Sequence, residues 1–138
     1  HLVIRRQRQM CIRDRAIIPG AGGTQRLPRI IGPAKALHWI TTGQIFDAEQ
    51  CYRDGVAQFV EEDDNALAKA MEIAAQIATN GPVAVRAAKR AIWAGVDVGL
   101  SEALELELEN YSKTISTGDR TEALEAFAEG RTPDFQGK

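Results

Sequence analysis

The sequence has 138 residues, of which 44% are hydrophobic and 26% charged, and its net charge is −2. These values predict at most one folded domain with a buried core and argue against an intrinsically disordered chain. No apolar run approaches the length of a membrane span. The two cysteines, Cys11 and Cys51, form neither a disulfide framework nor a metal-binding pattern, so we expect a reducing compartment and a cytoplasmic location.

Residues 1–15 differ in charge from the rest of the chain. They contain five arginines against one aspartate, whereas the remainder is acidic. They lack the apolar core of a secretory signal. A basic segment can be an arm that binds nucleic acid, but it can also be a solvated tail or sequence foreign to the gene. We expect this leader to be disordered or artefactual, and the acidic remainder argues against a nucleic-acid partner.

The next stretch combines an apolar run, a glycine-rich bend and a helix. Residues 16–18 are apolar and mostly β-branched, which predicts a strand end or a buried extended segment. Residues 19–23, Pro-Gly-Ala-Gly-Gly, break this run. A short helix is expected over 24–31, closed by Gly32. Backbone N–H groups at such a bend can face a ligand oxygen, although the spacing matches neither a P-loop nor a dinucleotide fingerprint and a plain turn is the commoner reading.

A second helix is expected over 33–42. Pro33 suits its first turn and Gly43 its end. His38 lies within it without a second histidine, serine or cysteine nearby in sequence, so we interpret it as a surface or core-edge residue and not as a catalyst. Residues 44–46 form a short extended link.

A third, shorter helix is expected over 48–54. Asp47 is a typical N-cap residue, and Gln50, three positions later, fits a capping box. Gly55 would end this helix. The alternation of apolar and small or polar residues over 56–60 then predicts a brief strand.

The rest of the chain is predicted to be helical. The acidic run at 61–64 suits the start of a helix better than a metal site, because ligands to one ion must converge. We expect helices over 66–78, from Pro82 to a connector at 95–99, from a Ser101 cap to a break at 117–118, and from an Asp119 cap, supported by Glu122, to a tail at 131–138. The Leu-Glu alternation at 104–109 could suggest a strand, but leucine and glutamate favour a helix.

Three strings, in order, resemble sequences of the crotonase family, the enoyl-CoA hydratases and isomerases. They are Ile-Pro-Gly-Ala-Gly-Gly-Thr-Gln-Arg-Leu at 18–27, Asn-Gly-Pro-Val-Ala at 80–84, and Asp-Arg-x-Glu-Ala leading into Phe-x-Glu-x-Arg at 119–131. The resemblance covers 16–138 and is nearest to enoyl-CoA hydratase and methylglutaconyl-CoA hydratase-like members. It implies the C-terminal part of an α/β crotonase-like domain: the last β-β-α turn of a spiral and a mainly helical region, truncated at the N-terminus.

The function that the resemblance implies is the addition of water across the 2,3 double bond of a short-chain trans-2-enoyl-CoA. Coenzyme A belongs to the substrate, so no separate cofactor and no metal are expected. The expected partners are the acyl-CoA and further copies of the chain, as a trimer or a dimer of trimers, without a membrane. The alternatives are another enolate reaction of the family, such as isomerisation, and a non-enzymatic helical module for trimerisation or interaction.

The resemblance also assigns residues. It implies that the backbone N–H of Gly20 helps to hold the catalytic water and that Pro19, Gly20, Tyr111 and Arg131 bind substrate. The second of the family's two catalytic glutamates would fall at Ile12, which cannot transfer a proton. The first would belong to a segment that precedes this sequence. We therefore expect the chain to lack both catalytic glutamates and to be inactive by itself.

Overall fold

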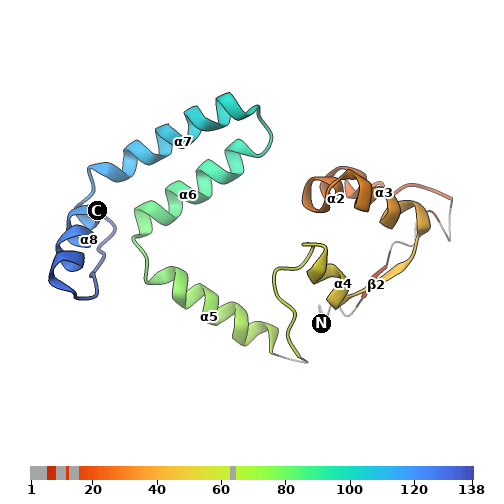
Figure 1. Cartoon of the computed structure of the whole chain (residues 1–138), viewed down its shortest axis with the longest axis horizontal. Coiled ribbons are helices and arrows are strands. Elements are labelled where there is room, and N and C mark those ends of the chain that lie inside the picture. The colour runs from red at the N-terminus through yellow and green to blue at the C-terminus, as the bar shows by residue number, and fades with distance from the viewer. Residues whose placement is uncertain (1–5, 9–11, 13–15, 63–64) are drawn as a thin grey trace. The chain divides into compact units, whose positions relative to one another are not determined.

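The computed structural model describes residues 6–8, 12, 16–62 and 65–138. The chain divides into two units, His1–Leu67 and Ala68–Lys138, and each is considered by itself. In chain order the elements are β1 (Arg6–Arg8), α2 (Gly23–Ile31), α3 (Pro33–Thr42), β2 (Ile45–Asp47), α4 (Ala48–Arg53), α5 (Ala66–Ala78), α6 (Pro82–Gly95), α7 (Leu100–Ile115) and α8 (Gly118–Glu129) (Figure 1).

Glycines separate the helices of the first unit. Gly22, at φ 85°, precedes α2, Gly32, at φ 83°, separates it from α3, and Gly43, at φ 59°, ends α3. These backbone angles are accessible to glycine at low cost, so the helices end where the sequence predicted. Their inner faces join β2 and α4 in one core, which consists of Leu27, Ile31, Ala36, Trp39, Phe46 and Cys51.

The sheet has two antiparallel strands, with Arg6 opposite Asp47 and Arg8 opposite Ile45. The sequence predicted an extended link around β2 but no partner for it within the basic leader. Three residues of the leader therefore have defined backbone pairing, which the expected disorder did not include. For the leader as a whole the expectation stays a prediction, because most of it lies outside the described residues.

Two expected extended segments differ in the structure. Residues 16–18 do not form a strand, and the side chains of Ile17 and Ile18 are exposed. Residues 56–60 also have no strand pairing in the described part of the chain, because the N–H groups of Val56 and Ala57 both donate to the carbonyl oxygen of Cys51. The backbone there closes the end of α4, so alternation alone was a misleading signal.

At the start of α4 one of the two predicted capping contacts is present. The carboxylate of Asp47 accepts a hydrogen bond from the N–H of Gln50 at 2.7 Å, as expected of an N-cap. The side chain of Gln50 does not return the bond as a capping box would. It donates to Asp54 at 2.8 Å, one turn later.

In the second unit α6 and α7 lie side by side (Figure 1). The Leu-Glu alternation is helical, as predicted, but α7 begins at Leu100 with Gly99 as its N-cap, so Ser101 is not the cap. Along α5 every residue is exposed or half-buried. Across the described residues, no helix is long and apolar enough to cross a membrane.

The last helix begins differently from the prediction. Thr117 is the N-cap of α8, and its hydroxyl oxygen accepts the N–H of Arg120 at 3.2 Å. Asp119 lies in the first turn and is buried, with 6% exposure. Residues 131–138, expected to be a tail, are held against this turn by hydrogen bonds to Asp119.

Candidate functional site

The glycine-rich turn is built by the start of α2. The carbonyl oxygen of Gly22 accepts the N–H groups of Gln25 and Arg26 at 3.1 and 2.9 Å. The guanidinium of Arg26 folds back and donates to the carbonyl oxygen of Ala21. Hydrogen bonds from residues of α2 therefore hold the turn, and the guanidinium of Arg26 is one of the donors.

The two predicted substrate-binding residues on this turn have different surroundings. Pro19 is half-buried, and a Cβ placed on Gly23 would lie 2.9 Å from the Cβ of Pro19. Gly20 is exposed, and a Cβ placed there would meet nothing within 4 Å. The space that a side chain at position 20 would occupy is therefore open.

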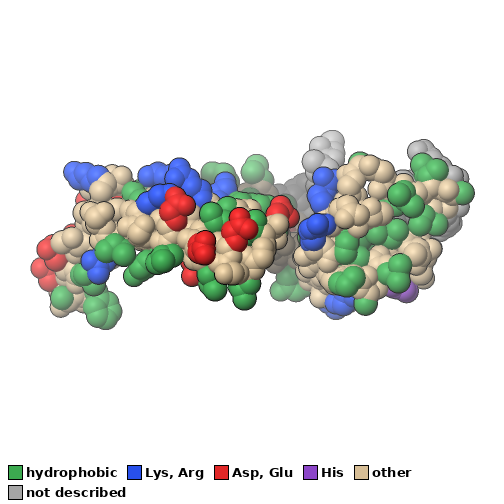
Figure 2. Space-filling model, turned by 90° about the horizontal axis from the view of Figure 1, so that it is seen from above, with side chains coloured by type: hydrophobic (Ala, Val, Ile, Leu, Met, Phe, Trp, Pro, Cys, Tyr) green, Lys and Arg blue, Asp and Glu red, His purple; other side chains and the backbone are tan. Residues whose placement is uncertain are grey.

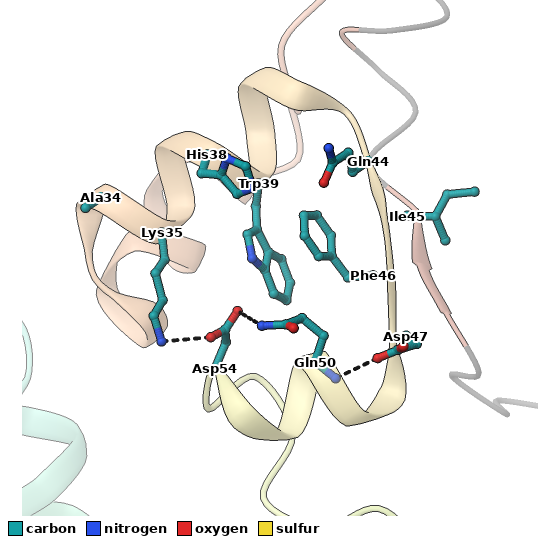
Figure 3. A pocket seen from close by; sticks show the side chains of 10 residues that line it. All are labelled: Ala34, Lys35, His38, Trp39, Gln44, Ile45, Phe46, Asp47, Gln50 and Asp54. Atoms are coloured by element: carbon teal, nitrogen blue, oxygen red, sulfur yellow. Dashed lines mark hydrogen bonds and ion pairs between the residues drawn. The ribbon is translucent and has the colours of Figure 1, made fainter.

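A pocket of about 630 Å³ lies between α3, β2 and α4. Figure 3 shows the residues that line it: Ala34, Lys35, His38, Trp39, Gln44, Ile45, Phe46, Asp47, Gln50 and Asp54. At its base the rings of Trp39 and Phe46 stack with centroids 3.9 Å apart and an interplanar angle of 8°. Lys35 Nζ lies 2.7 Å from the carboxylate of Asp54, which also accepts from Gln50.

The polar groups of this pocket bind one another. The hydrogen bond from Lys35, and then that from Gln50, hold the pKa of Asp54 below its ordinary value. His38 is exposed, and its ring lies edge-on to Phe46 at 6.5 Å, which agrees with a core-edge position. The pair of Lys35 and Asp54, 19 residues apart, gives no local sequence signal, so the sequence did not indicate this pocket.

Tyr111 belongs to the second unit, on α7, where it is 59% exposed. It lines two grooves. The larger, of about 340 Å³, lies between α6 and α7, and the smaller, of about 240 Å³, is lined by residues of α6, α7 and α8. The larger groove is also lined by four alanines of α6, at positions 84, 87, 88 and 91, and the smaller by Phe135. An aromatic ring beside apolar grooves can stack against a planar or apolar part of a ligand.

Arg131, the fourth predicted binding residue, is engaged within the unit. Its guanidinium binds Glu122 through two nitrogens and Glu129 through a third. Glu122, followed by Glu129, raises the pKa of Arg131 above its ordinary value, and Arg131 lowers the pKa of Glu122 to about 2. Its charge is therefore largely balanced by carboxylates. This arrangement fits a structural contact better than a free site for a ligand phosphate.

The predicted site residues thus fall into two groups, Pro19 with Gly20 in the first unit and Tyr111 with Arg131 in the second. At position 12, which the resemblance assigned to the second glutamate, the carbonyl oxygen of Ile12 accepts the N–H of Ala16 at 3.1 Å. Among the described residues, no group of three or more His, Cys, Asp or Glu could hold a metal ion.

A family model described as Enoyl-CoA hydratase/isomerase matches residues 15–138. This match covers nearly the whole chain. The chain belongs to the enoyl-CoA hydratase/isomerase family. The strings at the glycine-rich turn, at the start of α6 and along α8, which suggested this family, all lie within the matched range.

Curated relatives and solved structures agree with this membership. The chain is 44% identical over 127 residues to the mitochondrial methylglutaconyl-CoA hydratase of Rattus norvegicus, covering 89% of this chain and 40% of the relative. It is 37% identical over 122 residues to the 2,3-dehydroadipyl-CoA hydratase of Escherichia coli K12, covering 88% and 48%. The crystal structure of enoyl-CoA hydratase from Bacillus anthracis matches with a TM-score of 0.82 at 49% identity, covering 89% of this chain and 48% of that one.

These matches establish the crotonase-like fold for this chain. The chain spans less than half the length of the curated relatives that it matches. Its mainly helical content with few strands fits the C-terminal part of that fold.

Proposed function

We propose that this chain is the C-terminal part of an enoyl-CoA hydratase that adds water across the 2,3 double bond of a short-chain trans-2-enoyl-CoA. The observation that carries the proposal is the family match over 15–138 together with relatives named as hydratases. The expected cytoplasmic location stays a prediction, and the related rat enzyme is named as mitochondrial.

In this reaction one glutamate removes a proton from water while the water oxygen bonds to C3, and a second glutamic acid delivers a proton to C2. Negative charge develops on the thioester oxygen, where backbone N–H groups stabilise it. We assign to Gly20 the N–H that helps to hold the water. The exposure of Gly20 and the hydrogen bonds that hold the turn around it support this role.

Neither of the two glutamates has a counterpart in the 138-residue sequence. The second falls at Ile12, a hydrocarbon side chain that neither accepts nor donates a proton. We therefore propose that the 138-residue chain has no hydratase activity by itself.

A chimera tests the proposal. The N-terminal part of the Bacillus anthracis enzyme, through the residue aligned with position 15 and so with a glutamate at position 12, would be fused to residues 16–138 of this chain. We expect it to hydrate crotonyl-CoA, seen as loss of the conjugated enoyl absorbance. The matched chimera with isoleucine at position 12 should be inactive, as should the chain alone. A folded chimera that binds crotonyl-CoA without turning it over would contradict the hydratase assignment.

The second candidate is a non-enzymatic module for trimerisation or interaction through the helices. It is favoured by the exposed apolar residues of α5 and α7, such as Leu67, Met71 and Leu108. Under this candidate the chimera would assemble with further copies but remain inactive. An isomerase is distinguished by a different substrate. Supplied with a 3-enoyl-CoA, it would form the conjugated 2-enoyl-CoA, so the conjugated enoyl absorbance would rise.

A further inference from the structure

The C-terminal segment, residues 131–138, returns along α8 to the first turn of that helix (Figure 1). We call this segment the strap. Two carboxylates of α8 hold its backbone. Glu122 accepts the N–H of Asp134 at 2.8 Å, and Asp119 accepts the N–H groups of Gln136 at 2.7 Å and Gly137 at 2.9 Å. Hydrogen bonds to a charged acceptor are among the stronger ones in proteins.

The strap also completes the helix that holds it. The N–H of Asp119 donates to the carbonyl oxygen of Lys138 at 3.1 Å, while Thr117 accepts the next N–H of the same turn. Helix α8 therefore satisfies two of its N-terminal donors, one of them through the strap. The carboxylate of Asp119 lies in the first turn of α8, at the positive end of the helix dipole.

Apolar contacts extend the strap to α6. The ring of Phe135 is half-buried and lines the smaller groove together with Tyr111 and Val83. Gly137, at φ 74°, leaves room for the ring of Pro82, since a Cβ there would lie 3.0 Å from Pro82 Cγ. The strap thus joins the start of α8 to the start of α6.

We propose that the strap is a fixed wall of the groove beside Tyr111 and that Asp119 is the positioning residue that locks it in place. Without this carboxylate the backbone of residues 136–137 loses its acceptor, and Phe135 is released from the groove. The lock follows from the contacts of the strap alone. Only the identity of the molecule that would enter the groove, an acyl-CoA, rests on the proposed function.

The lock can be measured on the isotopically labelled 138-residue chain by amide hydrogen exchange. In Asp119→Asn we expect the amides of Gln136 and Gly137 to exchange about tenfold faster or more, because a charge-assisted acceptor is lost. Amides in the middle of α7 should keep their rates. Glu125→Gln, an equal charge change at an exposed position of the same helix, is the control and should leave the strap unchanged. Unchanged exchange in Asp119→Asn would overturn the lock.

A second pair of variants tests the strap without altering a carboxylate. Gly137 and Gly130 both have positive φ, 74° and 68°, but only Gly137 has a neighbour within 4 Å. Gly137→Ala should therefore speed exchange at Gln136 and shift the methyl resonances of Val83, whereas Gly130→Ala should do neither. If both variants behave alike, the contact with Pro82 does not hold the strap.

Titration with coenzyme A tests two claims separately: that Asp119 holds the strap in place, and that the groove beside Tyr111 binds an acyl-CoA. We expect coenzyme A to shift the resonances of Tyr111 in the wild-type chain and to do so more weakly in Asp119→Asn. Equal binding by both, despite faster exchange in the variant, would overturn the positioning role. Absence of any shift in the wild type would overturn the assignment of acyl-CoA to this groove, while the exchange rates would still decide whether Asp119 locks the strap.

Discussion

The glycine-rich turn contains two glycines with opposite requirements. A Cβ on Gly23 would press on Pro19 at 2.9 Å, whereas Gly20 has open space. We expect Gly23→Ala to lower the free energy of unfolding by about 1 kcal/mol, because overpacking outweighs the better helix propensity of alanine. Gly20→Ala should stay within about 0.5 kcal/mol of wild type. Urea unfolding of the two variants measures the difference, and equal midpoints would mean that the turn moves freely.

Asn110 on α7 is buried, with 6% exposure. Its amide nitrogen donates to the carbonyl oxygen of Leu106 at 2.8 Å, but within the described part of the chain its Oδ1 has no partner. An unpaired buried acceptor costs about 1–3 kcal/mol. Asn110→Leu, which has a similar branched shape, should therefore stabilise the chain by about 1 kcal/mol.

The matched variant for this position is Asn110→Asp, which buries an unpaired charge and should destabilise the chain clearly. Denaturant unfolding at neutral pH compares the two variants. If Asn110→Leu proves less stable than wild type, the side-chain amide of Asn110 stabilises the native state and the prediction is wrong.

Local sequence rules predicted that a helix starts near Asp119, but not which groups its carboxylate binds. An aspartate three residues before a glutamate is the signature of a helix start, and the helix does start there within two residues. The rule could not indicate that Thr117 would be the cap. The partners of Asp119 are backbone N–H groups 17 and 18 residues further along the chain, which no short motif specifies.

Among the elements, helices bounded by glycine or proline were predicted well, because caps and helix ends are local events. The bounds of α3 and α5 agree with the sequence to the residue. Extended segments were not predicted as well, since a strand requires a partner. Residues 56–60 alternate but do not form a strand, whereas residues 6–8, which belong to the basic leader, pair with β2.

The strap and α8 give a pH dependence. Arg131, with the N–H of Asp134, holds the pKa of Glu122 at about 2, below its ordinary value of 4.5. Glu122 therefore adds stability that is complete above pH 4.5 and declines as the pH falls toward 2. A carbon-detected NMR titration should find the Glu122 carboxyl ionised at pH 3.

Removal of the partner tests the cause of this shift. In Arg131→Gln the pKa of Glu122 should rise toward its ordinary value, and the amide of Asp134 should shift with the same midpoint. Because the pair is partly exposed, salt should weaken the shift in the wild type. A Glu122 carboxyl that titrates near its ordinary pKa in the wild type would contradict the contact with Arg131.

For the molecule as a whole, the candidate site was predictable only in part. The string at 18–27 located the turn with Gly20, because it is contiguous, whereas Tyr111 lies outside all three family strings and was assigned from the resemblance as a whole. The engagement of Arg131 by Glu122 and Glu129, and the pocket around Trp39, arise from tertiary contacts that the sequence alone does not display.

Exposed apolar side chains are spread over both units, as Figure 2 shows for one face. On α5, Leu67 is 73% and Met71 63% exposed. Large exposed apolar areas favour association, so we expect the isolated chain to self-associate. Light scattering over a concentration series should show mass rising with concentration. Met71→Lys should reduce this rise, whereas Gln76→Lys, the same new charge on the opposite face of α5, should not.

A stable monomer at every concentration would mean that the helices cover one another in solution.

The two tryptophans differ in their surroundings in a way that provides spectroscopic reporters. Trp39 is 2% exposed and stacked on Phe46, whereas Trp93 on α6 is 70% exposed. Indole emission moves to longer wavelength in water, so the first unit should contribute a blue, quencher-resistant component and the second a red component open to acrylamide. Each unit therefore has its own intrinsic fluorophore. One fluorescence titration could follow the melting of the two units separately, without any added label.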